Sequence, residues 1–326
     1  MGQVYNKIYT PEKWEKVNKE NKELIDDYIK ELKSQKKAEG TIKQYYSDLR
    51  IVAIWCLDNC DNRSMLELTK RDFRNLSLQC QEEYNMSNAR VNRIFSSVRT
   101  ILSFAEDDDE LYEDYDRNVA AKIKGLPKDP QREVVFLPND LIEELWQKLM
   151  DEERYKEATL LAILYDSGCR RNEIEQVERR SITPEGNATN PVRGKRGKIF
   201  KVLYFNHTKE AFLKYEDSRT DDSDKLFPAK ESESSYMSIY EWVVGWRKDL
   251  KELTGKDYPI NVHSFRHCFI EHMTDGTHWL CKELGLGRVP IEKVKTLAHH
   301  NDVSTTDSYR SNDEERDIAD LLGIKI

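Results

Sequence analysis

The sequence contains no apolar run long enough to cross a membrane, and its six cysteines form no recognisable pattern. A membrane-spanning helix needs about 20 mostly apolar residues, so we expect a protein that makes no membrane contact and stays in the cytoplasm. The cysteines include no CxxC pair and no histidine at zinc-ligand spacing, which argues against a disulfide framework and a structural metal. We therefore expect reduced, mostly buried thiols.

Internal repeats and low-complexity tracts are also missing, which leaves an ordinary globular chain. The hydrophobic fraction of 38% is low, but aromatic residues make up 10% and are spread throughout, which argues against disorder. A length of 326 residues gives room for two ordinary domains. We expect a soluble, mainly helical protein with two domains.

Excess positive charge is lacking as well, since the formal net charge is -8. This is unusual for a nucleic-acid-binding protein, because neutralisation of phosphates by Lys and Arg supplies much of the affinity. However, residues 106–116 contain eight acidic and no basic side chains, as many as the whole net charge. Outside this acidic segment, which we expect to be a solvated surface loop, the protein is neutral and compatible with DNA.

Helical patterns fill the first part of the chain. A proline at the first turn after Thr10 predicts a long helix that continues through Lys36. An apolar stripe from Tyr45 to Cys56 predicts a second helix, and a shorter one is expected around residues 70–79. A fourth helix is expected after the N-cap Ser87, with an apolar face that begins at Val91.

The composition then changes to lysine, glycine and proline between residues 122 and 138, which predicts a linker. We therefore expect a helical domain over residues 1–122, a linker over 123–137 and a second domain over 138–326. In the second domain, helical patterns flank a β-prone stretch with a basic glycine turn over residues 190–206, which predicts a β-hairpin. Further helices are expected around 208–215, 236–253, 263–273, 291–297 and 313–322.

Four short motifs follow one another in the second domain. In chain order, they are the turn Gly168-Cys169-Arg170 with Glu173 three residues on, the basic tip Gly194-Lys195-Arg196-Gly197-Lys198, the segment His263-Ser264-Phe265-Arg266-His267, and Leu297-Ala298-His299-His300 running on to Tyr309. Each motif alone is weak and is compatible with a structural role. The order and spacing of all four motifs together are a much more specific signal than any one of them.

The series resembles the active site of the tyrosine recombinases, the phage integrase family. The resemblance covers the whole second domain, and the first part resembles the helical, SAM-like core-binding domain of that family. It implies a mainly α fold with a small β-hairpin and an α/β catalytic-type domain. By position in the motifs, it implies the catalytic residues Arg170, Lys195, His263, Arg266, His300 and Tyr309. His300 keeps the family's usual nine-residue step to Tyr309, but His299 remains an alternative.

The chemistry of phosphodiester cleavage explains these residue types. Attack by a tyrosine hydroxyl builds negative charge on the phosphate oxygens, and arginine forks are suited to stabilise it. A tyrosine of pKa about 10 needs help to lose its proton, for which His263 is the candidate, and Lys195 is the candidate acid for the departing 5′-oxygen. No cofactor is implied. The candidate DNA contacts are Arg90, Arg93, Lys122, Lys124, Lys128, Arg171, Arg196 and Lys198.

Two functions remain open on the same fold. Departures from the family pattern, such as residues 177–181 where a tryptophan and an aspartate are usual, favour a phage DNA-binding repressor that regulates lysogeny without cutting DNA. The overall likeness to integrase-like repressors of SP-beta-type Bacillus prophages points the same way. The intact motif set favours a recombinase, which would act as a tetramer on double-stranded DNA, whereas a repressor would bind as a monomer or dimer. A type IB topoisomerase is less favoured, because the linker organisation of that family is missing.

Overall fold

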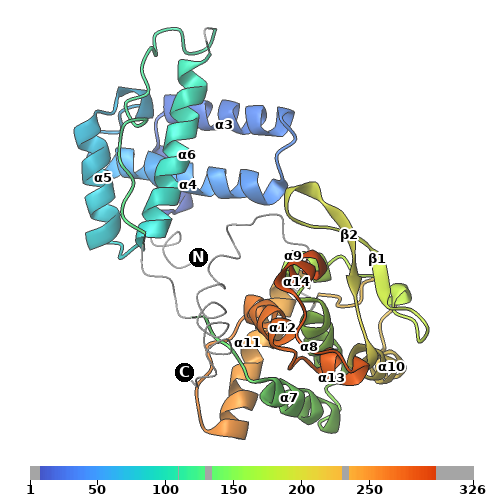
Figure 1. The fold of residues 1–326 in the computed structure, drawn as a ribbon. Helices are drawn as coiled ribbons and strands as arrows, with labels where there is room; N and C mark the ends of the chain where they lie inside the picture. The colour runs from blue at the N-terminus through green and yellow to red at the C-terminus, as the bar shows by residue number, and fades with distance from the viewer. Residues whose placement is uncertain (1–7, 109, 129–133, 230–234, 299–326) are drawn as a thin grey trace. The chain divides into compact units, whose positions relative to one another are not determined.

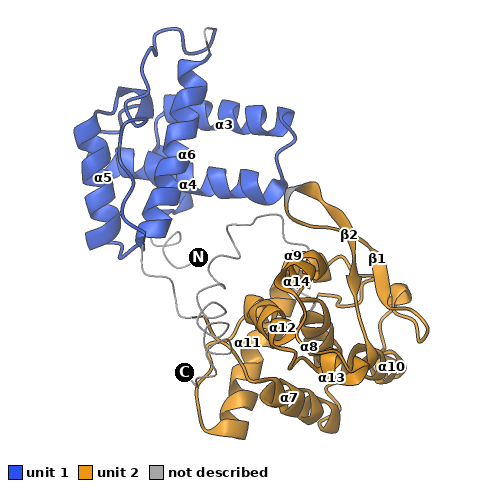
Figure 2. Ribbon diagram, viewed as in Figure 1, with its two compact units in different colours: residues 1–132 blue, residues 133–326 orange. Residues whose placement is uncertain are grey.

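The computed structural model describes residues 8–108, 110–128, 134–229 and 235–298, with the side chains of residues 196 and 236 excepted. The chain forms two compact units, Met1–Arg132 and Glu133–Ile326, which are coloured separately in Figure 2. No helix among the described residues is long and apolar enough to cross a membrane. All six cysteines are free and buried, as the sequence predicts.

The described part of the first unit is helical (Figure 1). Its elements are α2 (Pro11–Lys16), α3 (Lys19–Ser34), α4 (Glu39–Asn59), the 3-10 turn η1 (Met65–Glu67), α5 (Lys70–Glu82) and α6 (Asn88–Glu106). The helices expected after residue 40, around residue 70 and after Ser87 are confirmed. Their apolar faces form one hydrophobic core.

The single long helix predicted through Lys36 is wrong, because the chain breaks between α2 and α3. Asn18 interrupts it: its side chain accepts a hydrogen bond from the backbone N–H of Asn21 at 2.7 Å and caps α3. Its own backbone N–H donates to the side chain of Asn62, 44 residues away, at 3.0 Å. A local cap supported by a distant partner thus outweighs the continuous helical pattern.

The described part of the second unit is mainly helical with one two-stranded antiparallel sheet. Its elements are α7 (Asn139–Asp151), α8 (Tyr155–Ser167), α9 (Arg171–Ile174), η2 (Arg179–Ser181), β1 (Ala188–Arg193), η3 (Lys195–Gly197), β2 (Ile199–Leu203), α10 (Asn206–Ser218), α11 (Ser235–Thr254), α12 (Val262–Asp275), α13 (Trp279–Leu284) and α14 (Ile291–Leu297). The predicted hairpin and the helices expected around 208–215, 236–253, 263–273 and 291–297 are confirmed, whereas α13 was not expected. The helix expected at 313–322 lies outside the described residues.

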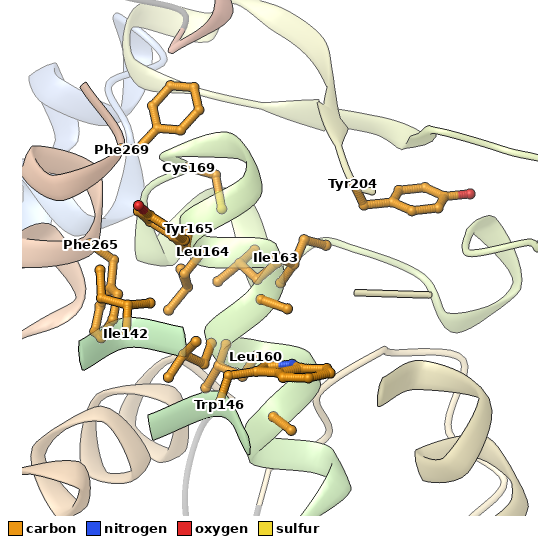
Figure 3. Packing of buried hydrophobic residues seen from close by; sticks show 14 of the residues in the cluster. Ile142, Trp146, Leu160, Ile163, Leu164, Tyr165, Cys169, Tyr204, Phe265 and Phe269 are labelled. Carbon is orange, nitrogen blue, oxygen red and sulfur yellow. The ribbon is translucent and has the colours of Figure 1, made fainter. Parts of the chain in front are cut away.

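Helix α8 is the centre of this unit. Every residue from Ala158 to Ser167 is buried, as expected for a helix that is apolar on all sides. Figure 3 shows side chains of α8 packed among those of α7 and α12, including Trp146 and Phe265. Because α8 ends at the glycine turn before Arg170, this packing gives the candidate site a rigid base.

Asp166, near the end of α8, ties three elements together. Its carboxylate accepts hydrogen bonds from the backbone N–H of Phe205 at 2.8 Å, the hydroxyl of Thr208 at 2.7 Å and the indole N–H of Trp279 at 2.8 Å. Burial raises its pKa to about 7. These contacts fix α10 and α13 against the end of α8.

Two buried histidines lie beside Tyr165 of α8. His272 Nδ1 is 2.6 Å from the Tyr165 hydroxyl, and His278 Nε2 is 3.0 Å from the Tyr165 carbonyl oxygen. Burial lowers the pKa of His272 to about 4 and that of His278 to about 3. Both rings are therefore neutral in the folded protein at pH 5, whereas an unfolded chain protonates them below about pH 6.5.

This difference predicts a stability contribution from His272 that is present above pH 6.5 and lost as the pH falls towards 4. Replacement of His272 by glutamine is therefore expected to destabilise the protein less at pH 5 than at pH 7, by about 1–2 kcal/mol. Urea unfolding of both proteins at the two pH values measures this. Asp166 titrates in the opposite direction, but its effect is common to both proteins and cancels. A pH-independent difference between them would contradict the assignment.

Candidate functional site

The site begins at the glycine turn after α8. Gly168 has a φ of +58°, and a Cβ atom there would lie 2.6 Å from the ring of Phe269, so only glycine fits without strain. The turn ends α8 and places Arg170 at the N-cap of the short helix α9.

Arg170 is held by Glu173, three residues further on. One carboxylate oxygen of Glu173 accepts the Arg170 backbone N–H at 2.7 Å, and the other accepts its guanidinium at 3.0 Å. Glu173 is only 1% exposed, whereas the side chain of Arg170 is 27% exposed. An arginine and a glutamate at this spacing usually form a surface pair, so the sequence alone did not indicate a buried carboxylate that orients a reachable guanidinium.

Arg266 of α12 is almost completely buried, with 1% exposure. Its guanidinium donates to the carbonyl oxygen of Gly168 at 2.5 Å and to that of Ala298, after α14, at 2.7 Å. Carbonyl oxygens carry no net charge, so these two bonds orient the guanidinium without neutralising it. Arg266 thus joins the glycine turn, α12 and the end of α14.

His263 lies one turn before Arg266 on α12. Its ring contacts that of His267 edge to face, with centroids 4.5 Å apart at 84°. Desolvation lowers the pKa of His263, and the positive charges of Arg266 and Arg170 lower it further. Arg266 bonds to the glycine turn that leads into Arg170, and His263 lies one turn before Arg266 on the same helix, so the three residues belong to a single site. At neutral pH the imidazole is uncharged and suited to accept a proton.

The hairpin lies next to the Arg170–Glu173 pair. A Cβ atom at Gly194 would lie 3.1 Å from the Glu173 carboxylate and 2.6 Å from the ring of Phe200, so the strand approaches α9 closely. Lys195 follows directly at the exposed tip, and Lys198 is exposed as well. The side chain of Arg196 lies outside the described residues.

The remaining predicted catalytic residues, His300 and Tyr309, also lie outside the described residues, as does His299. The described chain ends at Ala298, the residue that accepts a bond from Arg266. The choice between the two histidines therefore stays open. Within the described ranges, no group of three or more His, Cys, Asp or Glu side chains is arranged to hold a metal ion.

In the first unit, the candidate DNA contacts Arg90 and Arg93 share one buried acid. Asp48 of α4 is fully buried and lies 2.9 Å from the Arg90 guanidinium and 3.2 Å from that of Arg93. Ser97, one turn after Arg93 on α6, is buried as well, with its hydroxyl 3.5 Å from Asp48. The sequence did not single out Asp48, because its partners are more than 40 residues away.

The other candidate contacts differ in setting. Lys122, Lys124 and Lys128 are exposed along the segment that leaves the first unit. Arg171 is partly exposed, and its guanidinium lies over the ring of Tyr240 on α11 at 5.2 Å from the centroid.

Comparison with solved structures supports this description of the fold. The protein is similar to a lambda integrase dimer bound to a COC′ core site, with a TM-score of 0.62, 14% identity and coverage of 86% of this chain and 94% of that one. It is also similar to the Tn1549 transposon integrase in complex with circular intermediate DNA, with a TM-score of 0.60, 16% identity and coverage of 88% and 94%. At these identities the likeness establishes the fold alone.

Sequence comparison extends the likeness from the fold to the family. The SPbeta prophage-derived recombinase-like protein YomM of Bacillus subtilis is 26% identical over 91% of this chain and 89% of its own length. Residues 136–316, more than half of the chain, match the profile of the phage integrase family. With the glycine turn, the two arginines and the hairpin of the second unit in the family's order, the chain belongs to the phage integrase family, the family of the tyrosine recombinases.

Proposed function

We propose that the protein is a sequence-specific DNA-binding recombinase that cleaves and rejoins double-stranded DNA through a 3′-phosphotyrosyl link to Tyr309. The observation that carries the proposal is the grouping of Arg170, Arg266 and His263 around the Gly168 turn. Two oriented guanidiniums next to a neutral imidazole suit a phosphodiester, which is an anion that becomes more negative during attack.

In the proposed reaction, the Tyr309 oxygen attacks phosphorus while His263 accepts the phenolic proton. Arg170 and Arg266 bind the non-bridging oxygens and stabilise their growing charge. The bond between phosphorus and the 5′-oxygen breaks, and Lys195 donates a proton to that oxygen. The products are a phosphotyrosyl link and a free 5′-hydroxyl, and attack by another 5′-hydroxyl rejoins the strand.

The comparisons agree with this assignment. The relative YomM is described as recombinase-like, and the similar lambda and Tn1549 integrases are seen with DNA. The lambda protein is a dimer on its site, which favours self-association on DNA for this chain too. In the first unit, Arg90 and Arg93 together carry one positive charge more than Asp48, and the lysines of residues 122–128 are exposed, so both are proposed phosphate contacts.

A repressor that keeps the fold without cutting DNA is the second candidate. The net charge of -8 favours it, and so does the ion pairing of Arg90 and Arg93, because an arginine paired with a buried acid offers less charge to phosphate. Both candidates bind a specific DNA site, and they differ in whether a covalent product forms.

A covalent-trapping experiment distinguishes the two. The DNA site is first selected from a random pool, and the protein is then incubated with a nicked substrate from which the cleaved end diffuses away. We expect a covalent protein–DNA band on a denaturing gel from the wild type and none from Tyr309→Phe. Specific binding by both proteins without a covalent band would contradict cleavage and favour the repressor.

A further inference from the structure

Gln176 makes an unusual pair of contacts at the edge of the candidate site. It lies two residues after α9, and its amide nitrogen donates to the backbone carbonyl oxygen of Arg193 at 3.0 Å. Its amide oxygen accepts the backbone N–H of the same residue at 2.9 Å. The nitrogen also donates to the carbonyl oxygen of Asn172, in α9, at 2.5 Å. One side chain therefore pairs with strand β1 as a neighbouring strand would and bonds to α9 as well.

The contacted residue controls the hairpin tip. Arg193 is the last residue of β1, and Lys195 follows two positions later. Between them, Gly194 is confined by the Glu173 carboxylate and the Phe200 ring. The backbone two residues before Lys195 is therefore held against α9 by the Gln176 side chain. Because α9 also carries the Arg170–Glu173 pair, Gln176 sets the lysine against the first arginine.

The middle of β1 is held without the Gln176 side chain. The side chain of Asn190 accepts the backbone N–H of Glu178 at 2.8 Å and donates to the backbone oxygen of Gln176 at 3.1 Å. Strand β1 also pairs with β2 through Val192 and Phe200. Loss of the Gln176 side chain would leave these contacts in place, so it would loosen the tip without unfolding the hairpin.

We infer that Gln176 is a positioning residue that holds Lys195 where it can protonate the leaving 5′-oxygen. The inference rests on the proposed cleavage function and extends it to a residue outside the catalytic motifs. Gln176 is exposed in the free protein, as expected for a side chain that acts on a backbone segment and not as part of the core.

The test compares two substrates on Gln176→Met, which has a similar length but makes neither bond to Arg193. The first substrate is ordinary DNA, and the second carries sulfur in place of the bridging 5′-oxygen at the cleaved phosphate. A thiolate leaves without being protonated, so the second substrate does not need the acid. We expect Gln176→Met to form covalent product about 10-fold more slowly on ordinary DNA and at the wild-type rate on the sulfur substrate.

Two further variants calibrate the result. Lys195→Ala should show a larger loss of the same kind, restored by sulfur. Gln147→Met is the matched control, because Gln147 is an exposed glutamine on α7 that bonds only to Asp151 in the described contacts, and it should cleave both substrates at the wild-type rate. DNA affinity should be unchanged in the two glutamine variants, which remove no charge.

The outcomes separate the inference from the proposed function. An equal loss on both substrates, or no loss on either, would overturn the role of Gln176 while leaving cleavage by the wild type intact. A failure of sulfur to restore Lys195→Ala would overturn the lysine as the acid and the inference with it. A wild type that forms no covalent product on either substrate would reject the proposed function itself.

Discussion

Replacement of Arg266 by lysine is expected to reduce the rate of covalent DNA cleavage by about 100-fold or more. Lysine keeps the positive charge but has no planar fork, so it cannot bond to Gly168, Ala298 and a phosphate oxygen in fixed directions. The carbonyl of Gly168 belongs to the turn that positions Arg170, so the substitution should also disturb the first arginine. Single-turnover formation of the covalent product measures the effect.

A stability loss must be separated from this catalytic loss. Arg266 is buried, and a lost bond to a buried carbonyl costs about 1–3 kcal/mol of unfolding free energy. Arg247→Lys is the control: Arg247 of α11 donates to the carbonyl oxygen of Ile260, just before the N-cap of α12, at 3.0 and 2.7 Å, so it tests a disturbance of α12 that leaves the Arg266 guanidinium in place. We expect a comparable stability loss there with cleavage unchanged. A similar fall in cleavage for both variants would refute a specific role for Arg266.

The second large effect is expected at Glu173. Replacement by glutamine keeps the shape but turns one acceptor oxygen into a donor, which then faces the backbone N–H or the guanidinium of Arg170. We expect the guanidinium to leave its position, with cleavage reduced about 100-fold, since misplacement of a catalytic group by about 1 Å has an effect of that size. The unfolding free energy should fall by about 1–3 kcal/mol, because a buried donor loses its acceptor.

Glu157→Gln provides the comparison for this variant. Glu157 also pairs with an arginine three residues away in sequence, Arg154, at 2.8 Å, and it accepts the indole N–H of Trp246 at 2.8 Å. Its replacement should reduce stability without changing the cleavage rate measured on folded protein. Normal cleavage by Glu173→Gln, with only its stability reduced, would show that Arg170 does not depend on Glu173 for its position.

The sequence by itself determined the elements whose signals are local. Helical periodicity located α4, α6 and α12, because the residues that form a helix face are only three or four positions apart. Glycine and β-branched residues located the hairpin in the same way. The ordered motifs indicated the family. Their positions in the sequence also indicated Arg170, Lys195, His263 and Arg266 as candidate catalytic residues.

Tertiary structure alone decided which side chains are buried and what they bond to. Asp48 lies against arginines more than 40 residues away, Arg266 bonds to a carbonyl 98 residues away, and Gln176 bonds to a strand 17 residues away. The break between α2 and α3 also depends on a distant residue, Asn62. No local pattern encodes such pairs, because their free energy arises only when folding brings the two segments together and removes water from between them.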